Sequence, residues 1–159
     1  MSKSSRSLAV VLALLAVIAG LVSGCSPRPS ADTLEGPAKE VSSAVRAASL
    51  AVDLRMTDST TASAASTAAD DMLGEVEAAT DKIHGFDAPT QEERTLRNDV
   101  LASFSAISRA LLHARDVLTA SSGEPAASSD GQARLATVQA ELRTATDQLD
   151  SLMTKAGIQ

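Results

Sequence analysis

The stretch LATVQAELRTATDQLDSLMTKA (Leu135–Ala156) decides the fold, because its apolar residues recur at alternating steps of three and four. At 3.6 residues per turn, this spacing places the whole row on one face of a helix. Coiled coils and helical bundles pack along rows of this kind. The stretch therefore predicts a helix that packs against other helices. The row consists of Leu135, Val138, Leu142, Ala145, Leu149, Leu152 and Ala156.

Three earlier segments carry apolar rows with similar spacing, and no alternating strand pattern competes with them. Together, the four rows predict an all-α fold, an up-down-up-down four-helix bundle with coiled-coil-like heptad seams, in one domain over residues 32–159. We expect the helices at about 34–56, 59–84, 90–120 and 130–156. The first row is Leu34, Ala38, Val41, Val45, Ala48 and Val52; the second is Ala62, Ala65, Ala69, Met72, Val76, Ala79 and Ile83; the third is Leu96, Val100, Ile107, Leu111, Ala114 and Leu118, with Phe104 beside it.

Helix boundaries carry their own signals. TQEE (Thr90–Glu93) fits a capping box, in which a hydroxyl and a carboxylate accept from backbone N–H groups at a helix start. SDGQ (Ser129–Gln132) predicts a second, weaker cap. Gly85 follows the second segment, where we expect a glycine in the left-handed conformation to end the helix.

The junction MTDSTT (Met56–Thr61) leaves two arrangements open, because it contains neither glycine nor proline. Asp58 or Ser59 can cap a new helix after a turn, which gives the four-helix bundle. The spacing also continues across the junction, and without a turn the result is a three-helix arrangement with one long first helix. We favour the turn, because a run of Ser and Thr opposes continuous burial.

Composition restricts the classes of partner. Without residues 1–24, 12 Lys and Arg remain against 20 Asp and Glu, so the net charge is −8. An acidic domain repels nucleic acids, which are therefore not expected partners. Phe86 and Phe104 are the only aromatic residues, although ligand pockets and interfaces usually rely on aromatic side chains. The composition, with more Arg than Lys and much Ala, Ser, Thr and Asp, is typical of high-GC bacteria such as actinobacteria.

The N-terminal region predicts export. Lys3 and Arg6 precede an uncharged apolar run of 15 residues, Leu8–Val22, and small residues follow it. Charged start, apolar middle and small-residue end are typical of a secretory signal peptide, here residues 1–24. The run is shorter than the roughly 20 residues that a membrane-spanning helix needs. We therefore expect a cleaved signal rather than a permanent span.

The residues Val22-Ser23-Gly24-Cys25 resemble the lipobox of bacterial lipoproteins, an aliphatic residue, a small residue, Gly or Ala, and Cys. The resemblance implies that diacylglycerol is attached to the Cys25 thiol, that the chain is cut between Gly24 and Cys25, and that the new amino group is acylated. Two or more acyl chains anchor a protein stably. We therefore expect a lipid anchor on the extracytoplasmic face of the cell membrane, with residues 25–31 as a short polar tether.

The histidines and methionines raise the question of haem or metal binding, which bundles support through inward-facing side chains. On a helical wheel, His113 lies away from the third row and shares a face with Arg109 and Asp116. His84 falls in the last turn of its helix, where a cation suits the helix dipole. Both histidines therefore indicate solvent-exposed surface, and the sequence predicts no metal ligand. Met72 and Met153 are expected as core fillers.

An acidic group in the second segment also divides between two faces of a helix beside the apolar row. We expect it to be solvated, because the spaced acidic loop that wraps calcium is absent from the sequence. The sequence also lacks a recognisable nucleophile motif such as G-x-S-x-G or S-x-x-K in a strand-turn-helix setting. We therefore expect no catalytic residues and no enzyme activity. The acidic residues are Asp70, Asp71, Glu75, Glu77 and Asp81.

These features predict a membrane-anchored envelope lipoprotein that acts as a non-catalytic structural or protein-interaction module. Helical rows bind partner helices, so we expect a protein partner or a homodimer through helix faces. Alanine buries less area than leucine, and the Ala-rich segment 62–83 is expected to pack most weakly and to be the most available face. The alternative function is a small-ligand or metal-binding bundle that serves as an envelope sensor or carrier.

Overall fold

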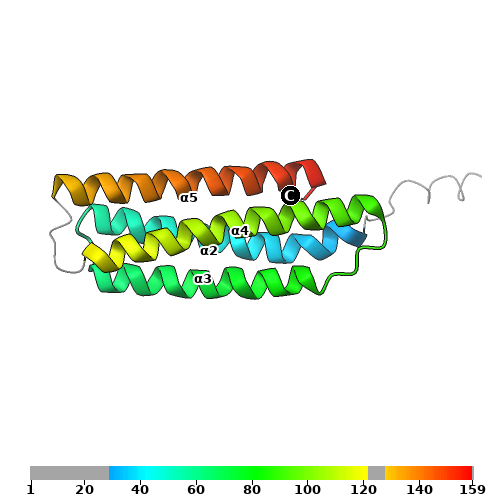
Figure 1. Cartoon of the computed structure of the whole chain (residues 1–159), viewed down its shortest axis with the longest axis horizontal. Helices are drawn as coiled ribbons and strands as arrows, with labels where there is room; N and C mark the ends of the chain where they lie inside the picture. The colour runs from blue at the N-terminus through cyan, green and yellow to red at the C-terminus, as the bar shows by residue number, and fades with distance from the viewer. Residues whose placement is uncertain (1–28, 122–127, 159) are drawn as a thin grey trace, which may run out of the picture.

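The structure is a computed structural model that describes residues 29–121 and 128–158. In these ranges the chain forms four helices and no strand, and successive helices run in opposite directions (Figure 1). The all-α four-helix bundle is therefore confirmed, and the alternative with one long first helix is wrong. The helices are α2 (Pro29–Met56), α3 (Ala62–His84), α4 (Gln91–Ala120) and α5 (Ser129–Ala156).

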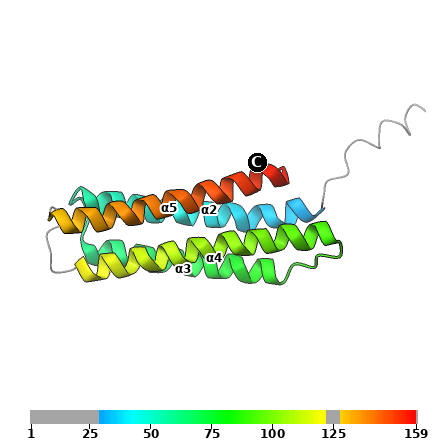
Figure 2. The ribbon, with the colours of Figure 1, turned by 45° about the horizontal axis from the view of Figure 1, so that its top comes forward.

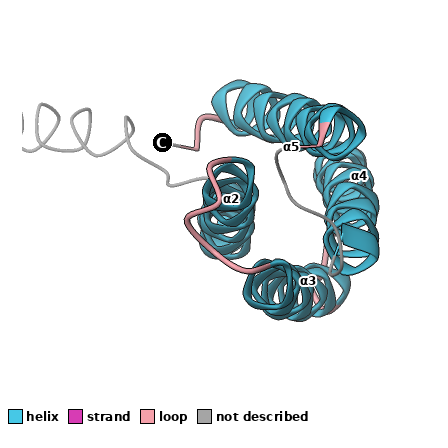
Figure 3. Cartoon of the chain, turned by 90° about the vertical axis from the view of Figure 1, so that its left-hand side faces the viewer, coloured by secondary structure: helices cyan, strands magenta, loops and turns pink. Residues whose placement is uncertain are grey.

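The four helices form a ring around one core when the bundle is viewed from its end (Figure 3). Helices that are consecutive in the chain pack together, and α5 returns beside α2 to close the ring (Figure 2). The packing is uneven, because α5 contacts α2 less extensively than α3 contacts either α2 or α4. The seam between α2 and α5 is consequently the most open side of the ring.

The predicted rows fill the core. All six members of the first row are at most 1 % exposed, and Phe104, which we placed beside the third row, is fully buried. Burial of such rows supplies most of the stability of a bundle. Leu96 of the third row and Leu152 and Ala156 of the fourth are only partly buried. These three residues lie near the start of α4 and the end of α5, so the core thins at that end of the bundle.

The turn between α2 and α3 spans residues 57–61, and Thr61 is the N-cap of α3. Its hydroxyl accepts a hydrogen bond from the N–H of Ala64 at 3.1 Å. The prediction of Asp58 or Ser59 as the cap is therefore wrong. Both residues serve the turn instead: Asp58 adopts a positive φ of 53°, and the N–H of Ser59 donates to the carbonyl of Leu54 at 2.8 Å.

The other caps follow the predictions in part. The capping box at Thr90 is confirmed, since the Glu93 N–H donates to the Thr90 hydroxyl and the Glu93 carboxylate accepts from the Thr90 N–H. The cap of α5 is Ser128 rather than Ser129, with its hydroxyl accepting from the N–H of Gly131. The prediction at this helix was wrong by one residue.

Two helix ends differ from the expectation for glycine. Gly85 ends α3 with φ of −74° in the right-handed region, so the predicted left-handed cap is wrong. Its N–H still donates to the carbonyl of Asp81, which satisfies an orphan carbonyl without the left-handed conformation. The left-handed glycine cap stands at Gly157, with φ of 76°, after α5.

The first helix begins earlier than predicted, at Pro29 rather than near residue 34. Residues 29–31, which we assigned to the tether, are therefore helical. Proline is tolerated in the first helical turn because its missing N–H would have no helical partner there. Pro37 also lies inside α2, in its third turn, where the proline removes one backbone hydrogen bond.

Candidate functional site

The predicted lipid anchor lies outside the described residues. Both Gly24 and Cys25 fall in residues 1–28, so lipidation and cleavage stay predictions from the lipobox. Within residues 29–121 and 128–158, the structure contains no helix with the length and apolarity that crossing a membrane requires. Residues 26–28 are all that separates Cys25 from the first residue of α2.

The histidines lie on the surface, as the helical wheel indicated. His84 is exposed in the last turn of α3. His113 is exposed on α4, and its Nδ1 lies 2.7 Å from a carboxylate oxygen of Glu141 on α5. The sequence did not predict this contact between helices. Met72 and Met153 are partly buried against the core, which agrees with their assignment as fillers.

The acidic residues of α3 are all solvent-exposed, which confirms the solvated face. Asp70 lies 3.4 Å from Arg115 of α4, whose guanidinium also contacts Asp116 at 2.9 Å. The hydrogen bond from Asp116 raises the pKa of Arg115, and Asp70 adds to that effect. In the described part of the chain, no three His, Cys, Asp or Glu side chains are grouped as metal ligands would be.

The expectation that the Ala-rich segment packs most weakly and offers the most available face is wrong. The row alanines of α3 point into the core, and α3 packs extensively against both of its neighbours. Small side chains explain this packing, because they let helix backbones approach closely, so little area per residue does not mean weak packing. The buried alanines are Ala62, Ala65, Ala69 and Ala79.

An exposed apolar row lies instead on the outer face of α2, opposite its core row. Leu50 is 58 % exposed and Leu54 is 39 % exposed, and with Leu112 they are the exposed large apolar side chains of the described residues. Ala47 precedes Leu50 by three residues and is also exposed. We call Ala47, Leu50 and Leu54 the outer row. Its steps of three and four place all three side chains on one helix face.

A groove follows the seam between α2 and α5 beside the outer row. One part has a volume of about 540 Å³ and runs past Lys39, Ser42 and Met153. A second part, of about 280 Å³, contains Leu50 itself. Arg46 lines both parts, so the outer row has a continuous polar flank on the α5 side.

On α2, the charged flank of the outer row consists of Arg46 and Asp53, which line the groove with Leu50 between them in sequence, and Arg143 and Asp147 of α5 line the same part of the groove. The carboxylate of Asp53 accepts a hydrogen bond from Nε2 of Gln139 on α5 at 3.0 Å. Across residues 29–121 and 128–158, Arg46 and Asp53 take part in no ion pair. Gln139 itself is largely buried, which fixes Asp53 against α5.

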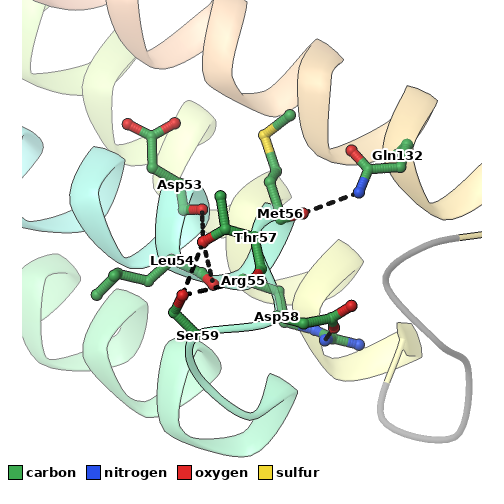
Figure 4. Close-up of polar contacts among 8 residues, drawn as sticks. All are labelled: Asp53, Leu54, Arg55, Met56, Thr57, Asp58, Ser59 and Gln132. Carbon is green, nitrogen blue, oxygen red and sulfur yellow. Dashed lines mark hydrogen bonds and ion pairs between the residues drawn. The ribbon is translucent and has the colours of Figure 1, made fainter.

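Polar contacts fix the end of α2, where Leu54 of the outer row lies (Figure 4). Nε2 of Gln132 on α5 donates to the carbonyl of Met56 at 2.9 Å, so the last residue of α2 is tied to the start of α5. Arg55, whose side chain is 9 % exposed, pairs with Asp58 at 2.7 Å. These contacts tie the end of α2 to α5 and to the turn that follows it. Leu54 is consequently presented on a rigid helix rather than on a loop.

Comparisons with known protein families, curated proteins and solved structures found no match to this chain. Its function must therefore be argued from its own residues. The outer row was missed at the sequence level, because the core row of α2 has more members and the same spacing. The signal was nevertheless present: Leu50 and Leu54 lie four residues apart and on the opposite side of the helical wheel from Val45 and Val52.

Proposed function

We propose that this chain is a cell-envelope lipoprotein, anchored through Cys25, whose helical bundle acts as a non-catalytic protein-interaction module. The observation that carries the interaction role is the outer row of α2, where two leucines stay in solvent although the bundle has a well-filled core. Exposed leucines on a rigid helix are typical of surfaces that bind another helix. The polar groove beside them provides the rim that protein interfaces usually have.

The anchor and the surface are compatible in space. Cys25 precedes α2 by a few residues, so the acyl chains would attach near the end of the bundle at which α2 begins. The outer row lies in the second half of α2, away from that end. A lipid-anchored chain of this kind leaves the row accessible to another protein at the membrane.

Lipid labelling tests the anchor. Cells that express the full chain are fed a fatty-acid analogue, and labelling is compared between the wild type, Cys25→Ala and the matched control Ser26→Ala. We expect labelled protein in the membrane fraction for the wild type and the control, and none for Cys25→Ala. Equal labelling of all three chains would contradict the lipoprotein assignment.

Cross-linking tests the interaction role independently of the anchor. The full chain is treated with a lysine- and carboxylate-reactive cross-linker in intact membranes, and Leu50→Asp is compared with Leu112→Asp. Leu112 is the matched control, because it is an exposed leucine on α4. We expect Leu50→Asp to remove cross-linked species that Leu112→Asp retains. Identical patterns for both variants would remove the outer row from the proposal.

A further inference from the structure

We propose that the partner of the outer row is a second copy of this chain, bound through an antiparallel, two-fold symmetric pair of α2 helices centred near Leu50. The inference rests on the proposed function, because membrane anchoring is what makes a contact of this size sufficient. Three observations carry it: the symmetry of the outer row, the charges that flank it, and the absence of an ion pair for those charges within the described residues.

The outer row is complementary to its own reversed copy. Ala47 lies three residues before Leu50 and Leu54 lies four residues after it. In an antiparallel pair centred near Leu50, the two Leu50 side chains meet at the two-fold axis. Each Leu54 then meets Ala47 of the second copy, so a large side chain packs against a small one, as in knobs-into-holes packing. A two-fold interface needs this kind of self-complementary surface.

The flanking charges fit the same register. Arg46 lies four residues before Leu50 and Asp53 three residues after it, and both line the groove on the α5 side. An antiparallel helix pair brings equivalent flanks together, so Arg46 of each copy faces Asp53 of the other. Interhelical pairs at such flanking positions set partner choice and orientation in coiled coils. A parallel two-fold pair would instead place the two equivalent flanks on opposite sides of the interface, so Arg46 and Asp53 would not meet.

Both charges are exposed, and within the described residues neither forms an ion pair with Arg143 or Asp147 of α5, which line the same part of the groove. Arg46 is exposed and lines both parts of the groove. Asp53 uses one carboxylate oxygen for the hydrogen bond from Gln139, which orients the carboxylate and leaves its second oxygen for a guanidinium. Orientation by Gln139 lowers the entropy that the carboxylate loses on pairing.

The contact is small, and the anchor compensates for its size. Stable interfaces bury about 1,200–2,000 Å² in total, whereas a single helix pair with two leucines from each copy lies at the weak end of that range. Confinement to a membrane raises the effective concentration of the second copy without any new contact. The first residues of the two α2 helices lie about 60 Å apart in this pair, so both anchors reach one membrane when the bundles lie along its surface.

Disulfide cross-linking of the full chain in its membrane tests the pair. Leu50→Cys is expected to form a disulfide-linked dimer on mild oxidation, because the two substituted positions meet at the two-fold axis within disulfide reach. Leu112→Cys is the matched control, and the wild type measures any cross-link made by Cys25 itself. We expect at least a fivefold excess of dimer for Leu50→Cys over both. Equal dimer in Leu50→Cys and Leu112→Cys would overturn the proposal.

The register has its own test. Ala47→Cys and Leu54→Cys are expected to cross-link poorly when expressed alone and efficiently when the two variants are expressed together, since these positions meet only across the antiparallel pair. Efficient cross-linking of each variant alone would indicate a parallel pair and would contradict the proposal. Lipid labelling of Cys25 in the same membranes separates the two proposals, because a lost label rejects the anchor and a lost cross-link rejects the pair.

Charge reversal tests whether Arg46 of one copy pairs with Asp53 of the other. Arg46→Asp or Asp53→Arg alone should reduce the Leu50→Cys cross-link about fivefold or more, because each replaces two attractions with two repulsions. The double variant, which exchanges the two charges, should restore it. A double variant that stays as low as the single variants would show that the charges do not meet across the interface.

Discussion

The two faces of α2 carry apolar rows with the same spacing and opposite surroundings. The inner face, from Leu34 to Val52, is at most 1 % exposed at every row position, whereas Leu50 and Leu54 on the outer face are 58 % and 39 % exposed. Spacing therefore predicts that a helix has a packing face, but it does not identify what covers that face. Other helices of the same chain cover the inner row, and we propose that a second copy of the chain covers the outer row.

The difference between the rows also separates stability from association. The inner row faces matching rows on α3, α4 and α5, so its contacts determine the free energy of unfolding. The outer row contacts solvent in the isolated chain and contributes little to that free energy. Substitutions on one helix can therefore test the two roles separately.

The largest expected effect comes from placing a charge on each face. Val45→Asp buries an unpaired carboxylate in the core and should lower the free energy of unfolding by more than about 4 kcal/mol, enough to abolish folding. Leu50→Asp should change it by less than about 0.5 kcal/mol. Circular dichroism during urea titration of the full chain in detergent measures the free energy of unfolding of both variants. Similar destabilisation by the two variants would contradict the distinction between the faces.

A truncation of the same residue type sharpens the comparison. Leu34→Ala removes a fully buried side chain and should cost about 2–5 kcal/mol, through lost burial and the cavity left behind. Leu54→Ala makes the identical change on the outer row and should cost about 0.5 kcal/mol or less. Thermal melts of the two variants give the difference. A loss above about 1.5 kcal/mol for Leu54→Ala would place the outer row in the core.

A smaller effect is expected where α2 ends and α3 begins. Thr61→Ala removes the hydroxyl that accepts from the N–H of Ala64, and loss of an N-cap costs about 1 kcal/mol. Thr60→Ala makes the identical change one position before the cap, so it is the matched control and should leave the free energy of unfolding nearly unchanged. Equal effects of the two substitutions in a urea titration would argue against Thr61 as the cap.

The smallest effect is expected for a polar contact on the surface. His113→Ala removes the contact with Glu141, in which both side chains are nearly half exposed, so the cost should be about 0.5 kcal/mol or less. His84→Ala serves as the control for loss of an exposed imidazole. A cost above about 1 kcal/mol for His113→Ala, with no such cost for His84→Ala, would contradict a solvent-exposed contact.

The sequence predicted the helices well because each core row repeats a local period. The turn at residues 57–61 was also predictable, since the polar run there interrupts burial. The cap residues were less predictable than the turn, because Asp58, Ser59 and Thr61 are all good N-cap residues. Only the geometry of the turn selects Thr61. The same ambiguity explains the shift from Ser129 to Ser128.

The candidate site was less predictable than the fold. Contacts such as Gln132 with Met56 and Gln139 with Asp53 join residues that are far apart in the chain, and no local pattern encodes them. The outer row was visible in the sequence but has fewer members than the core row beside it. Lipidation of Cys25 stays a prediction from the lipobox, because that residue lies outside the described ranges.

The most direct test of the central claim is hydroxyl-radical labelling of the full chain in its own membrane, read at two leucines of nearly equal exposure. Leu54 is 39 % exposed and Leu112 is 36 % exposed, so an isolated chain should be modified equally at both. We predict that Leu54 is protected severalfold relative to Leu112 in the wild type, and that Leu50→Asp removes this protection. Equal modification of Leu54 and Leu112 in the wild type would contradict the account.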